Sequence, residues 1–410
     1  MSELITVESL QKLISENIAQ SRLVFDVEAV PVSDLTGRVL AEPIVATLNI
    51  PNADISAMDG YALCGPANAG DQFQVIGESI AGKSFEGHVA ADQAVRIMTG
   101  AHVPADCHTV IIQENVLREG DTITLQSPVE TGKNIRYLGE VVKQGNPVFE
   151  IGRVLSIGDI LMLASLGYAH VKVYRKVKVA VFSTGSELQE VGTDITNDDM
   201  IFDSNRQMIM AKLKSMNAVE VIDCGSAHDS LEGITQMLDE ARKKADVVIT
   251  SGGASVGDYD FIKEAVEKIG TIHHYKVAMK PGKPFVFGAL GDSWYFGLPG
   301  NPVSGFAGFE VFVRHAITEL QAKSATPQML RFPAVLTHDL KKSPGRKEYQ
   351  RARIEEVSVG QWQVTLLRGQ DSHNVLGASQ ANAFAILPAD GAALKAGESI
   401  MVQPFKDCFL

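Results

Sequence analysis

The fold of this chain is decided by one stretch, which reads DVVITSGGASVGDYDF at residues 246–261, YKVAMKPGKPFVF at 275–287 and WYFGLPGNPVSGF at 294–306. Two apolar runs within it, Val247–Thr250 and Trp294–Leu298, are short and uninterrupted, as are strands buried on both faces of a parallel sheet. Each run ends in a loop rich in glycine or proline, and helical spacing follows the loop. This order is typical of an α/β domain, which binds ligands at the carboxyl edge of its sheet.

The loops that follow these two runs predict a site for an anion. Glycines allow backbone N–H groups to approach an anion, and the N-terminus of a following helix adds partial positive charge. Asp258 and Asp260 have the oxygen ligands that divalent cations prefer, so a metal ion held against the same anion is expected. The other residues concerned are Gly252, Gly253, Ser255, Gly257, Pro299, Gly300 and Pro302 in the loops and Lys276, Lys280 and Lys283 between them.

Strand-like and helix-like segments alternate from Val179 onward. This alternation predicts right-handed βαβ units, and therefore a parallel sheet with helices on both faces. The run VAVFST ends in a third polar loop, Thr184–Leu188, which contains Glu187, and Asp229 follows a further strand. Because the carboxyl ends of parallel strands meet at one edge of a sheet, these loops are expected to converge. Carboxylates in such loops suit Mg²⁺, which commonly shares its coordination with substrate phosphates.

The chain on either side of this region follows other patterns. Thr6–Ala19 has apolar residues at helical spacing and a threonine suited to the N-cap, which predicts an amphipathic helix. Gln72–Pro128 alternates short apolar runs with Gly, Asp and Pro, a pattern typical of a small, mainly β domain. Beyond Gln321 the short extended runs predict a β-barrel or sandwich of about 80 residues. Domain boundaries are therefore expected near Val177 and Gln321.

Polar residues outside the α/β region have ordinary interpretations when each is considered alone. Three such residues are Asp59, Thr99 and Arg136, which lie in loops or at strand ends. At such positions a polar side chain is usually structural or solvated. In the C-terminal region, strand alternation places Tyr349, Arg351 and Arg353 on one face. An exposed basic face of this kind suits either solvent or an anionic group.

The composition describes a globular chain of 410 residues, 45% hydrophobic and 21% charged, with a formal charge of −12. This charge argues against a general nucleic-acid binder. The four cysteines, Cys64, Cys107, Cys224 and Cys408, form no CxxC pair, so a disulfide framework and a thiolate zinc site are not indicated. No run approaches the ~18 apolar residues of a membrane span, and the first residues do not resemble a signal peptide. We expect a soluble cytoplasmic protein without nucleic-acid or membrane partners.

Three common enzyme signatures do not fit the sequence. A Ser-His-Asp hydrolase could use Ser251, Ser255 or Ser372 with His373. However, no GxSxG elbow follows a strand, as such an enzyme would require. The Walker A pattern GxxxxGK[ST] is absent, so the glycine loops are not a P-loop. A GxGxxG motif after the first strand of the alternating region is also missing. The anion site therefore depends on the convergence of several loops.

Taken together in their order, the motifs resemble a known family. In chain order the motifs are MDGYA, RIMTGA, STGxEL, SGGxSVGxxD, KPGKP, GLPGNPVS, PGRxxxQR and a Ser-His pair. This combination covers nearly the whole chain and is similar to the molybdopterin molybdenumtransferases, the bacterial MoeA family, which is related to the E domain of gephyrin.

The resemblance implies an elongated homodimer of multidomain protomers. Each protomer would have a discontinuous N-terminal unit with linking and dimerisation roles (1–48 and 140–177), an inserted, mainly β domain (49–139), a molybdopterin-binding α/β sandwich domain (178–321) and a C-terminal β-barrel (322–410). The family hydrolyses adenylylated molybdopterin and inserts molybdate at its dithiolene, releasing AMP, with a divalent metal such as Mg²⁺. The molybdopterin adenylyltransferase and other proteins of the cofactor pathway are the implied partners.

The resemblance also implies roles for individual residues. The implied catalytic residues are Asp59, Thr99, Glu187, Asp229, Asp260, Lys276 and Lys280, with Glu187 and Asp260 holding the metal ion. The implied substrate contacts are Arg136, Gly252, Gly253, Ser255, Gly257, Pro299, Gly300, Pro302, Arg351 and Ser372. In the family, residues at the positions of Asp59, Thr99 and Arg136 enter the site from the partner subunit, which makes the site composite.

The chain departs from the family pattern where members typically have aspartate, since it has Val141 after Arg136–Glu140 and Ser186 in TGSEL. Two further hypotheses remain beside molybdenum insertion. One is molybdopterin adenylyltransferase activity, which uses a related α/β domain. The other is a weakly active paralogue with a binding or scaffold role, comparable to that of the gephyrin E domain.

Overall fold

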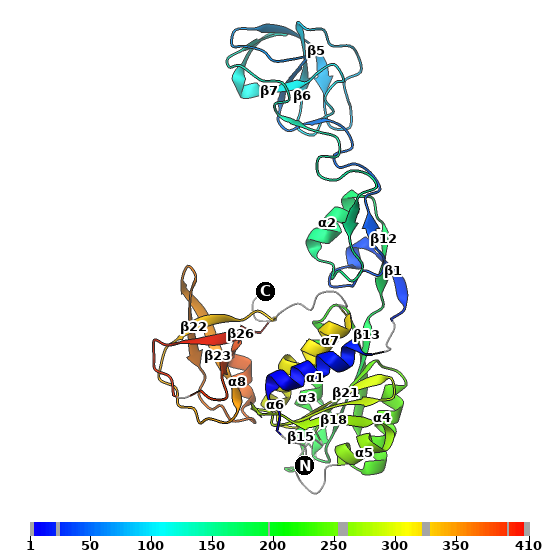
Figure 1. Ribbon diagram of the computed structural model, residues 1–410, viewed down its shortest axis with the longest axis vertical. Helices are drawn as coiled ribbons and strands as arrows, with labels where there is room; N and C mark the ends of the chain where they lie inside the picture. Colours follow the sequence, from blue (N-terminus) through cyan, green and yellow to red (C-terminus); the bar gives the residue numbers. More distant parts are fainter. Residues whose placement is uncertain are drawn as a thin grey trace.

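The computed structural model describes residues 4–21, 25–195, 197–252, 261–321, 329–391 and 393–405. The described chain forms an elongated molecule, with the α/β sheet and the C-terminal strands at one end and an inserted sheet at the other (Figure 1). Among the described residues, no helix combines the length and the apolar character needed to cross a membrane.

The α/β region is built on a six-stranded sheet. In spatial order its strands are β16 (Val219–Ala227), β13 (Val177–Thr184), β17 (Val247–Ser251), β21 (Ser293–Leu298), β20 (Pro284–Leu290) and β18 (Thr271–Lys276). The first four strands are parallel, as predicted, but β20 and β18 are antiparallel to their neighbours. The expectation of a wholly parallel sheet was wrong at this edge. A tight turn joins β20 to β21, and the segment 277–283, which contains the two-residue strand β19, joins β18 to β20. Neither connection is long enough for the crossover that parallel pairing needs.

Helices cover both faces of this sheet (Figure 1). Alternate residues of β13 face opposite sides, so Val179 and Val181 belong to one apolar core and Ala180 and Phe182 to the other. The first core includes α1 (Val7–Ala19), α3 (Ser204–Lys214), α6 (Pro302–Gly308) and α7 (Arg314–Gln321). The second includes α4 (Leu231–Arg242) and α5 (Phe261–Ile269). A π-helical segment, Phe309–Val313, joins α6 to α7.

Helix α1 packs against the α/β region. It begins as predicted, because the Thr6 side chain accepts a hydrogen bond from the Ser9 N–H at 3.1 Å. Leu10 and Ile14 lie one turn apart and are fully buried in the first core. Gln11 Nε2 donates to the carbonyl of Val311 at 3.0 Å, which fixes α1 on the segment before α7.

Strands from both sides of the inserted sheet form a middle unit. Its pairs are β1 (Val27–Pro31) with β12 (His170–Tyr174) and β2 (Ile44–Val45) with β11 (Pro147–Phe149). A further pair, β3 (Ile55–Ser56) with β10 (Ile135–Arg136), lies against the inserted domain, where Ile135 packs on its core. The short 3₁₀ helix η1 (Val32–Asp34) and helix α2 (Ile157–Ser165) complete it. One apolar core contains residues from both segments, including Leu40 and Val173. The N-terminal unit is therefore discontinuous.

The inserted sheet has six strands and lies beyond the middle unit (Figure 1). In spatial order these are β7 (Thr109–Ile112), β4 (Gly60–Leu63), β6 (Gln93–Ile97), β5 (Gln72–Ser79), β9 (Thr122–Leu125) and β8 (Val116–Glu119). The 3₁₀ helix η2 (Gln113–Asn115) follows β7. The small, mainly β domain predicted from the sequence is confirmed.

The C-terminal region is a closed β-barrel with one short helix, α8 (Val375–Gln380). Its strands are β22 (Phe332–Leu336), β23 (Lys347–Ser358), β24 (Gln361–Leu366), β25 (Ala383–Leu387) and β26 (Ser399–Pro404). The long strand β23 pairs with both β24 and β25, and this double pairing closes the barrel. The two-residue strand β19 (Met279–Lys280) of the α/β region pairs with the start of β23, so the two regions are joined by backbone hydrogen bonds.

Candidate functional site

Three loops meet at the carboxyl edge of the α/β sheet, as the sequence predicts. Gly252, which follows β17, has a φ of +90°, and a Cβ there would lie 2.2 Å from the carbonyl oxygen of Thr184. A Cβ on Gly300, which follows β21, would lie 3.7 Å from the Cα of Gly252. Only glycine permits the first of these approaches, so its backbone fixes the distance between two loops. Gly253, Ser255, Gly257, Asp258 and Asp260 lie outside the described residues.

Asn205 ties the same loops together from helix α3. Its Nδ2 donates to Ser251 Oγ at 2.9 Å and to the carbonyl of Gly300 at 2.7 Å. The side chain is largely buried, with the residue 8% exposed. The spacing of apolar residues in α3 does not predict this role of Asn205, because the role depends on how α3 packs against two distant loops.

Two predicted carboxylates flank the turn at Thr184 and Gly185. Thr184 Oγ1 donates to Asp229 Oδ1 at 3.0 Å. The Glu187 carboxylate bends back over Gly185, where an added Cβ would meet its Oε2 at 2.7 Å. Both acidic side chains belong to exposed residues. The structure therefore brings Glu187 and Asp229 to the same turn.

A buried arginine anchors the loop that contains Glu187. The short strands β14 (Leu188–Gln189) and β15 (Ile201–Phe202) pair in this loop, and the Ile201 N–H donates to the Glu187 carbonyl at 2.8 Å. Arg206 of α3, whose side chain is 3% exposed, bonds to carboxylates on three neighbouring segments. These acceptors are Glu190, Asp203 at 2.9 Å and Asp223 at 2.6 Å. No sequence pattern predicts this network, because its members come from separate segments.

The network lowers the pKa of one of its carboxylates, that of Asp223. Gly225 donates a backbone N–H to Asp223, and the Arg206 guanidinium pairs with the same group. These interactions outweigh the opposing effect of burial and lower the pKa of Asp223. Asp203 also accepts from Ser183 Oγ and, as the N-cap of α3, from the Arg206 N–H at 3.2 Å. The Glu187 loop is therefore fastened to β13, β16 and α3.

The described residues at this edge include two carboxylates of the expected metal site. Glu187 and Asp229 supply carboxylate oxygens, the ligand type that Mg²⁺ takes. No group of three or more His, Cys, Asp or Glu suited to a metal ion occurs among the residues that the structure describes. A complete ligand set therefore requires other groups, such as substrate phosphates, water or residues outside the described ranges.

The predicted lysines lie on the segment that runs from the end of β18 to the start of β20. Lys280 ends β19, and its Nζ lies 3.5 Å from Glu348 Oε1 with its side chain 51% exposed. Lys276 ends β18, and its Nζ lies 5.6 Å from the ring centroid of Tyr275. Lys283 is exposed in the turn that leads to β20. Lys280 is the lysine at the junction with the barrel.

The second predicted loop is in contact with the barrel. Pro299 is buried, Gly300 is exposed, and Pro302 is the first residue of α6. The Val303 N–H, which the sequence suggested as part of a helix N-terminus facing an anion, donates to the carbonyl of Ser372 at 3.1 Å. This donor is therefore used to hold the barrel loop 369–374 against the start of α6.

The exposed basic face expected at Tyr349, Arg351 and Arg353 was wrong. Tyr349 and Arg351 are each 1% exposed, and Arg353 alone is exposed. The Arg351 guanidinium donates to the backbone carbonyls of Gly369 and Asp371 at 2.8 and 3.0 Å. This face lies opposite the barrel core, which contains Ala352 and Ile354 of the same strand. It is nevertheless buried, because Tyr349 packs against Phe384 in the core shared with the α/β region and the loop 369–374 covers Arg351.

Asp59 and Thr99, predicted separately, are in direct contact. Asp59 Oδ1 accepts from the Thr99 N–H at 2.7 Å and from Thr99 Oγ1 at 2.8 Å. These two hydrogen bonds, the backbone bond first, lower the pKa of Asp59, with a smaller contribution from the charge of Arg96. Asp59 precedes β4, and Thr99 follows β6, the strand paired with β4.

Arg136 extends from the connector that leaves the inserted sheet. Its NH1 group lies 3.3 Å from Glu140 Oε1, and its side chain is 63% exposed. The inserted sheet and the loop that ends in β15 lie at opposite ends of the long axis (Figure 1). A single chain therefore does not bring Asp59, Thr99 or Arg136 to Glu187.

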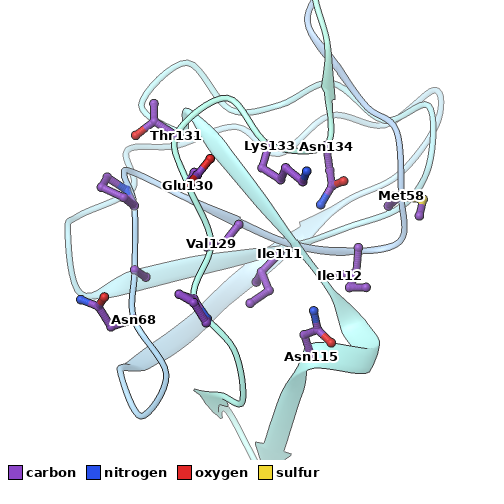
Figure 2. Close-up of a pocket in the computed structure, with 13 residues that line it drawn as sticks. Met58, Asn68, Ile111, Ile112, Asn115, Val129, Glu130, Thr131, Lys133 and Asn134 are labelled. Carbon is purple, nitrogen blue, oxygen red and sulfur yellow. The ribbon is translucent and has the colours of Figure 1, made fainter.

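A cavity of about 740 Å³ opens beside Asp59 in the inserted domain. Met58 lines it, and Figure 2 shows the polar side chains of Asn115, Lys133 and Asn134 around the apolar Ile111 and Ile112. Its size is within the range of small-ligand pockets. Sequence reasoning missed this cavity because its walls come from separate segments.

Comparison with known proteins covers nearly the whole chain. Residues 5–167 match the MoeA N-terminal region (domain I and II), residues 180–319 a probable molybdopterin binding domain, and residues 333–405 the MoeA C-terminal region (domain IV). A protein of Haemophilus influenzae named molybdopterin molybdenumtransferase is 39% identical over 97% of this chain and 98% of its own length. A protein of the same name from Staphylococcus aureus strain COL is 34% identical over 96% of this chain and 93% of its length.

A solved structure has the same architecture. The molybdopterin biosynthesis MoeA protein of Pyrococcus horikoshii OT3 superposes with a TM-score of 0.83 at 28% identity, covering 98% of this chain and 100% of that chain. The family matches, the full-length identities and the shared architecture agree with one another. The chain therefore belongs to the molybdopterin molybdenumtransferase family, the MoeA family.

Proposed function

We propose that this protein inserts molybdate into adenylylated molybdopterin and releases AMP. The observation that carries the proposal is the convergence of the loops after β13, β17 and β21 at one sheet edge, beside Glu187, Asp229 and Lys280. Full-length relatives at 34–39% identity named molybdopterin molybdenumtransferase support the same activity.

The reaction requires negative charge to be offset at two places. Cleavage of the pyrophosphate link between pterin and adenylate develops charge on phosphate oxygens, and molybdate itself is a tetrahedral dianion. Lys276 and Lys280 offset this charge in the proposal, while the backbone of Gly252 and Gly300 permits close approach of an anion. Ser372, held at the start of α6, supplies a neutral contact from the barrel.

Glu187 and Asp260 are the proposed metal ligands, with Asp229 beside them. Magnesium, when bound, would neutralise phosphate charge and orient the pyrophosphate for cleavage. Glu187 suits this role because its exposed carboxylate lies at the turn where the loops meet and because the Arg206 network fixes its loop. Gly253, Ser255 and Gly257 complete the proposed phosphate-binding loop.

We propose a homodimer in which the inserted domain of one subunit completes the site of the other. The inserted sheet, whose strands β4 and β6 adjoin Asp59 and Thr99, lies at the opposite end of the long axis from β15, the strand bonded to Glu187 (Figure 1). Residues of the inserted domain would therefore reach such a site only from a second copy, and Arg136 is proposed to enter with them. An uncovered apolar surface on α2 supports association, because Ile157 and Leu161 are 75% and 71% exposed on one helix face.

We propose a cytoplasmic location, because the described cysteines, Cys64, Cys107 and Cys224, are free thiols, as is usual in a reducing compartment. The molybdopterin adenylyltransferase that supplies the adenylylated substrate is a proposed partner. Binding to this enzyme would transfer the substrate without release into solution.

The decisive assay supplies purified protein with adenylylated molybdopterin, molybdate and Mg²⁺. The expected products are AMP and a cofactor that reconstitutes a molybdenum-free apoenzyme, and both should decrease when the metal is chelated. The absence of both products would reject the proposal. A parallel reaction with unmodified molybdopterin and ATP separates the alternative, because ATP consumption there would identify an adenylyltransferase.

A further inference from the structure

A second cavity, of about 660 Å³, lies where three regions of the chain meet. Its walls come from the middle unit, the α/β region and the barrel, which contribute Val154, Met216 and Phe332 respectively. A Cβ on Gly37 of the middle unit would lie 2.8 Å from the Cβ of Asn217, so the first two regions are in close contact there. The volume of the cavity is within the range of small-molecule sites.

This cavity lies at the opposite edge of the α/β sheet from the candidate functional site. Ala218, which lines it, directly precedes β16, and the Ala218 carbonyl accepts from Gln321 Nε2 at 2.8 Å. The loops of the candidate functional site instead follow β13, β17 and β21, strands that run parallel to β16 or to one another. The cavity is therefore separate from the proposed oxyanion site.

Two hydrogen-bond donors on the cavity wall have no acceptor within the part of the chain that the structure describes. Gln403 is 1% exposed, and its Oε1 accepts from Arg331 Nε at 3.0 Å, which leaves Nε2 as a buried donor without a partner. Arg314 uses its Nε and NH2 groups on Glu310, both at 2.9 Å, and its NH1 group is not used in this pair. A buried donor without an acceptor is costly, so a ligand with acceptor oxygens would be favoured here.

The same wall has an excess of positive charge. Glu310 lies between two cations, since Lys212 Nζ donates to its Oε1 at 2.7 Å and Arg314 binds both of its oxygens. Burial opposes ionisation of Glu310, but the hydrogen bonds and charges of Arg314 and Lys212 outweigh it and lower the pKa of this carboxyl. One carboxylate thus faces two cations, and the remaining positive charge favours an anionic ligand.

Aromatic side chains from the barrel form another part of the wall. The rings of Phe332 and Trp362 lie 5.0 Å apart between centroids, and Phe405 lines the cavity beside the end of β26. Aromatic faces of this kind pack well against a flat apolar body. The cavity therefore combines an apolar wall with donors for one negatively charged group.

We propose that this cavity binds a small aromatic carboxylate, with its ring against Phe332, Trp362 and Phe405 and its carboxylate at Gln403 Nε2 and the Arg314 guanidinium. The site takes no part in the proposed insertion reaction, and the inference does not depend on that reaction. Because the walls come from three regions, an occupant would hold these regions together and stabilise the folded chain.

The first experiment compares naphthoate with naphthamide, which has the same ring and no charge. Isothermal titration calorimetry on the purified full chain should show naphthoate binding at least about 10-fold tighter than naphthamide. Naphthoate should also raise the melting temperature. Excess molybdate should not displace it. Absence of naphthoate binding, equal affinities of the two probes, or displacement by molybdate would each overturn the proposal.

A substitution that fills the cavity locates the bound probe. Thr318 lines the cavity from α7, and its Oγ1 donates to the Arg314 carbonyl one turn earlier, at 2.8 Å. Thr318→Phe should weaken naphthoate binding by at least about 10-fold, because the ring would occupy the space. Thr235→Phe is the matched control, since Thr235 is a half-buried helical threonine with the same bond, to Leu231, at 2.6 Å. Equal binding by Thr318→Phe and the control would place the probe elsewhere.

Gln403→Leu tests the buried donor with little change in side-chain size. It should weaken naphthoate binding by about 10-fold and leave naphthamide binding less affected, because a hydrogen bond to a charged group is the stronger one. An unchanged affinity for naphthoate would exclude Gln403 from the site and contradict the proposed orientation of the carboxylate.

The intrinsic fluorescence of the wild-type protein decides the matter if Thr318→Phe does not fold. The chain has two tryptophans, and of these Trp362 lines the cavity. Naphthoate should quench the emission of Trp362, and Trp362→Phe should lose most of the quenching while calorimetry still detects binding. Quenching that persists in full in Trp362→Phe would show that the probe binds outside this cavity.

Discussion

Thr99 donates both its backbone N–H and its hydroxyl to the same carboxylate oxygen of Asp59, at 2.7 and 2.8 Å. These two hydrogen bonds join residues at adjacent strand ends of the inserted sheet, since Asp59 precedes β4 and Thr99 follows β6. In the proposed dimer, these residues would face the partner's α/β loops as one charged unit.

Thr99→Val should raise the pKa of Asp59 toward its ordinary value, because it removes the hydroxyl donor and leaves the N–H. A group with a depressed pKa stabilises the fold above its unfolded pKa, and this contribution is lost as the pH falls through the folded pKa. The stability difference between wild type and variant should therefore be present at neutral pH and vanish at acidic pH. An NMR titration of the Asp59 carboxyl measures the shift. Thr122→Val, at an exposed strand position, should leave the titration unchanged.

Lys280→Ala should lower AMP release in the insertion assay by at least ~10-fold, because one positive charge at the proposed oxyanion site is lost. Glu348→Gln should have a smaller effect, since it frees Lys280 from its partner at 3.5 Å. Lys341→Ala, on the exposed surface of the barrel, is the control and should retain full activity. Full activity in Lys280→Ala would exclude that lysine from the site.

Arg206→Leu should destabilise the protein strongly, because it leaves the buried Asp203 carboxylate without its cation. Removing one partner of a buried ion pair costs about 3–5 kcal/mol. Arg242→Leu removes a partly exposed ion pair with Asp239 and should cost about 1 kcal/mol or less. Urea unfolding of the two variants measures the difference. Equal costs would show that the Arg206 network does not hold the Glu187 loop.

Gly252→Ala should lower both the melting temperature and the activity. Gly252 and Gly70 have similar φ angles of +90° and +95°, but only an added Cβ at Gly252 would meet another atom, the Thr184 carbonyl oxygen at 2.2 Å. Gly70→Ala should therefore show the cost of the backbone conformation alone, about 1–2 kcal/mol. The additional loss in Gly252→Ala reports the contact between the two loops. A larger loss in Gly70→Ala would contradict this contact.

Ile157→Glu combined with Leu161→Glu should dissociate the proposed dimer, because two charges would enter an apolar contact on α2. Sedimentation velocity should show a monomer for this double variant and a dimer for the wild type. Val359→Glu is the control, since Val359 is 100% exposed on a barrel hairpin. A wild-type monomer at micromolar concentration, or a dimer that survives the double substitution, would reject this interface.

Much of the fold could be predicted because helices and buried strands leave periodic patterns in contiguous residues. The helical spacing expected after each of the two loops is confirmed by α5 and α6, and the Thr6 N-cap was also correct. The antiparallel edge formed by β18 and β20 was not predicted, because strand direction depends on the connections and not on apolar spacing. The Cys64 and Cys107 thiols are likewise neighbours only in the fold, where burial raises the pKa of Cys107 to about 12.

The candidate site, like the fold, could be predicted from the sequence only in part. The sequence by itself determined the loop chemistry, since glycines, prolines and charged residues after Val247–Thr250 and Trp294–Leu298 are local features. Only the tertiary structure decided that Asp59 meets Thr99 and that Arg351 is buried beneath the loop 369–374. Such contacts join residues far apart in the chain, and they follow from strand register, barrel closure and side-chain burial, which no local pattern specifies.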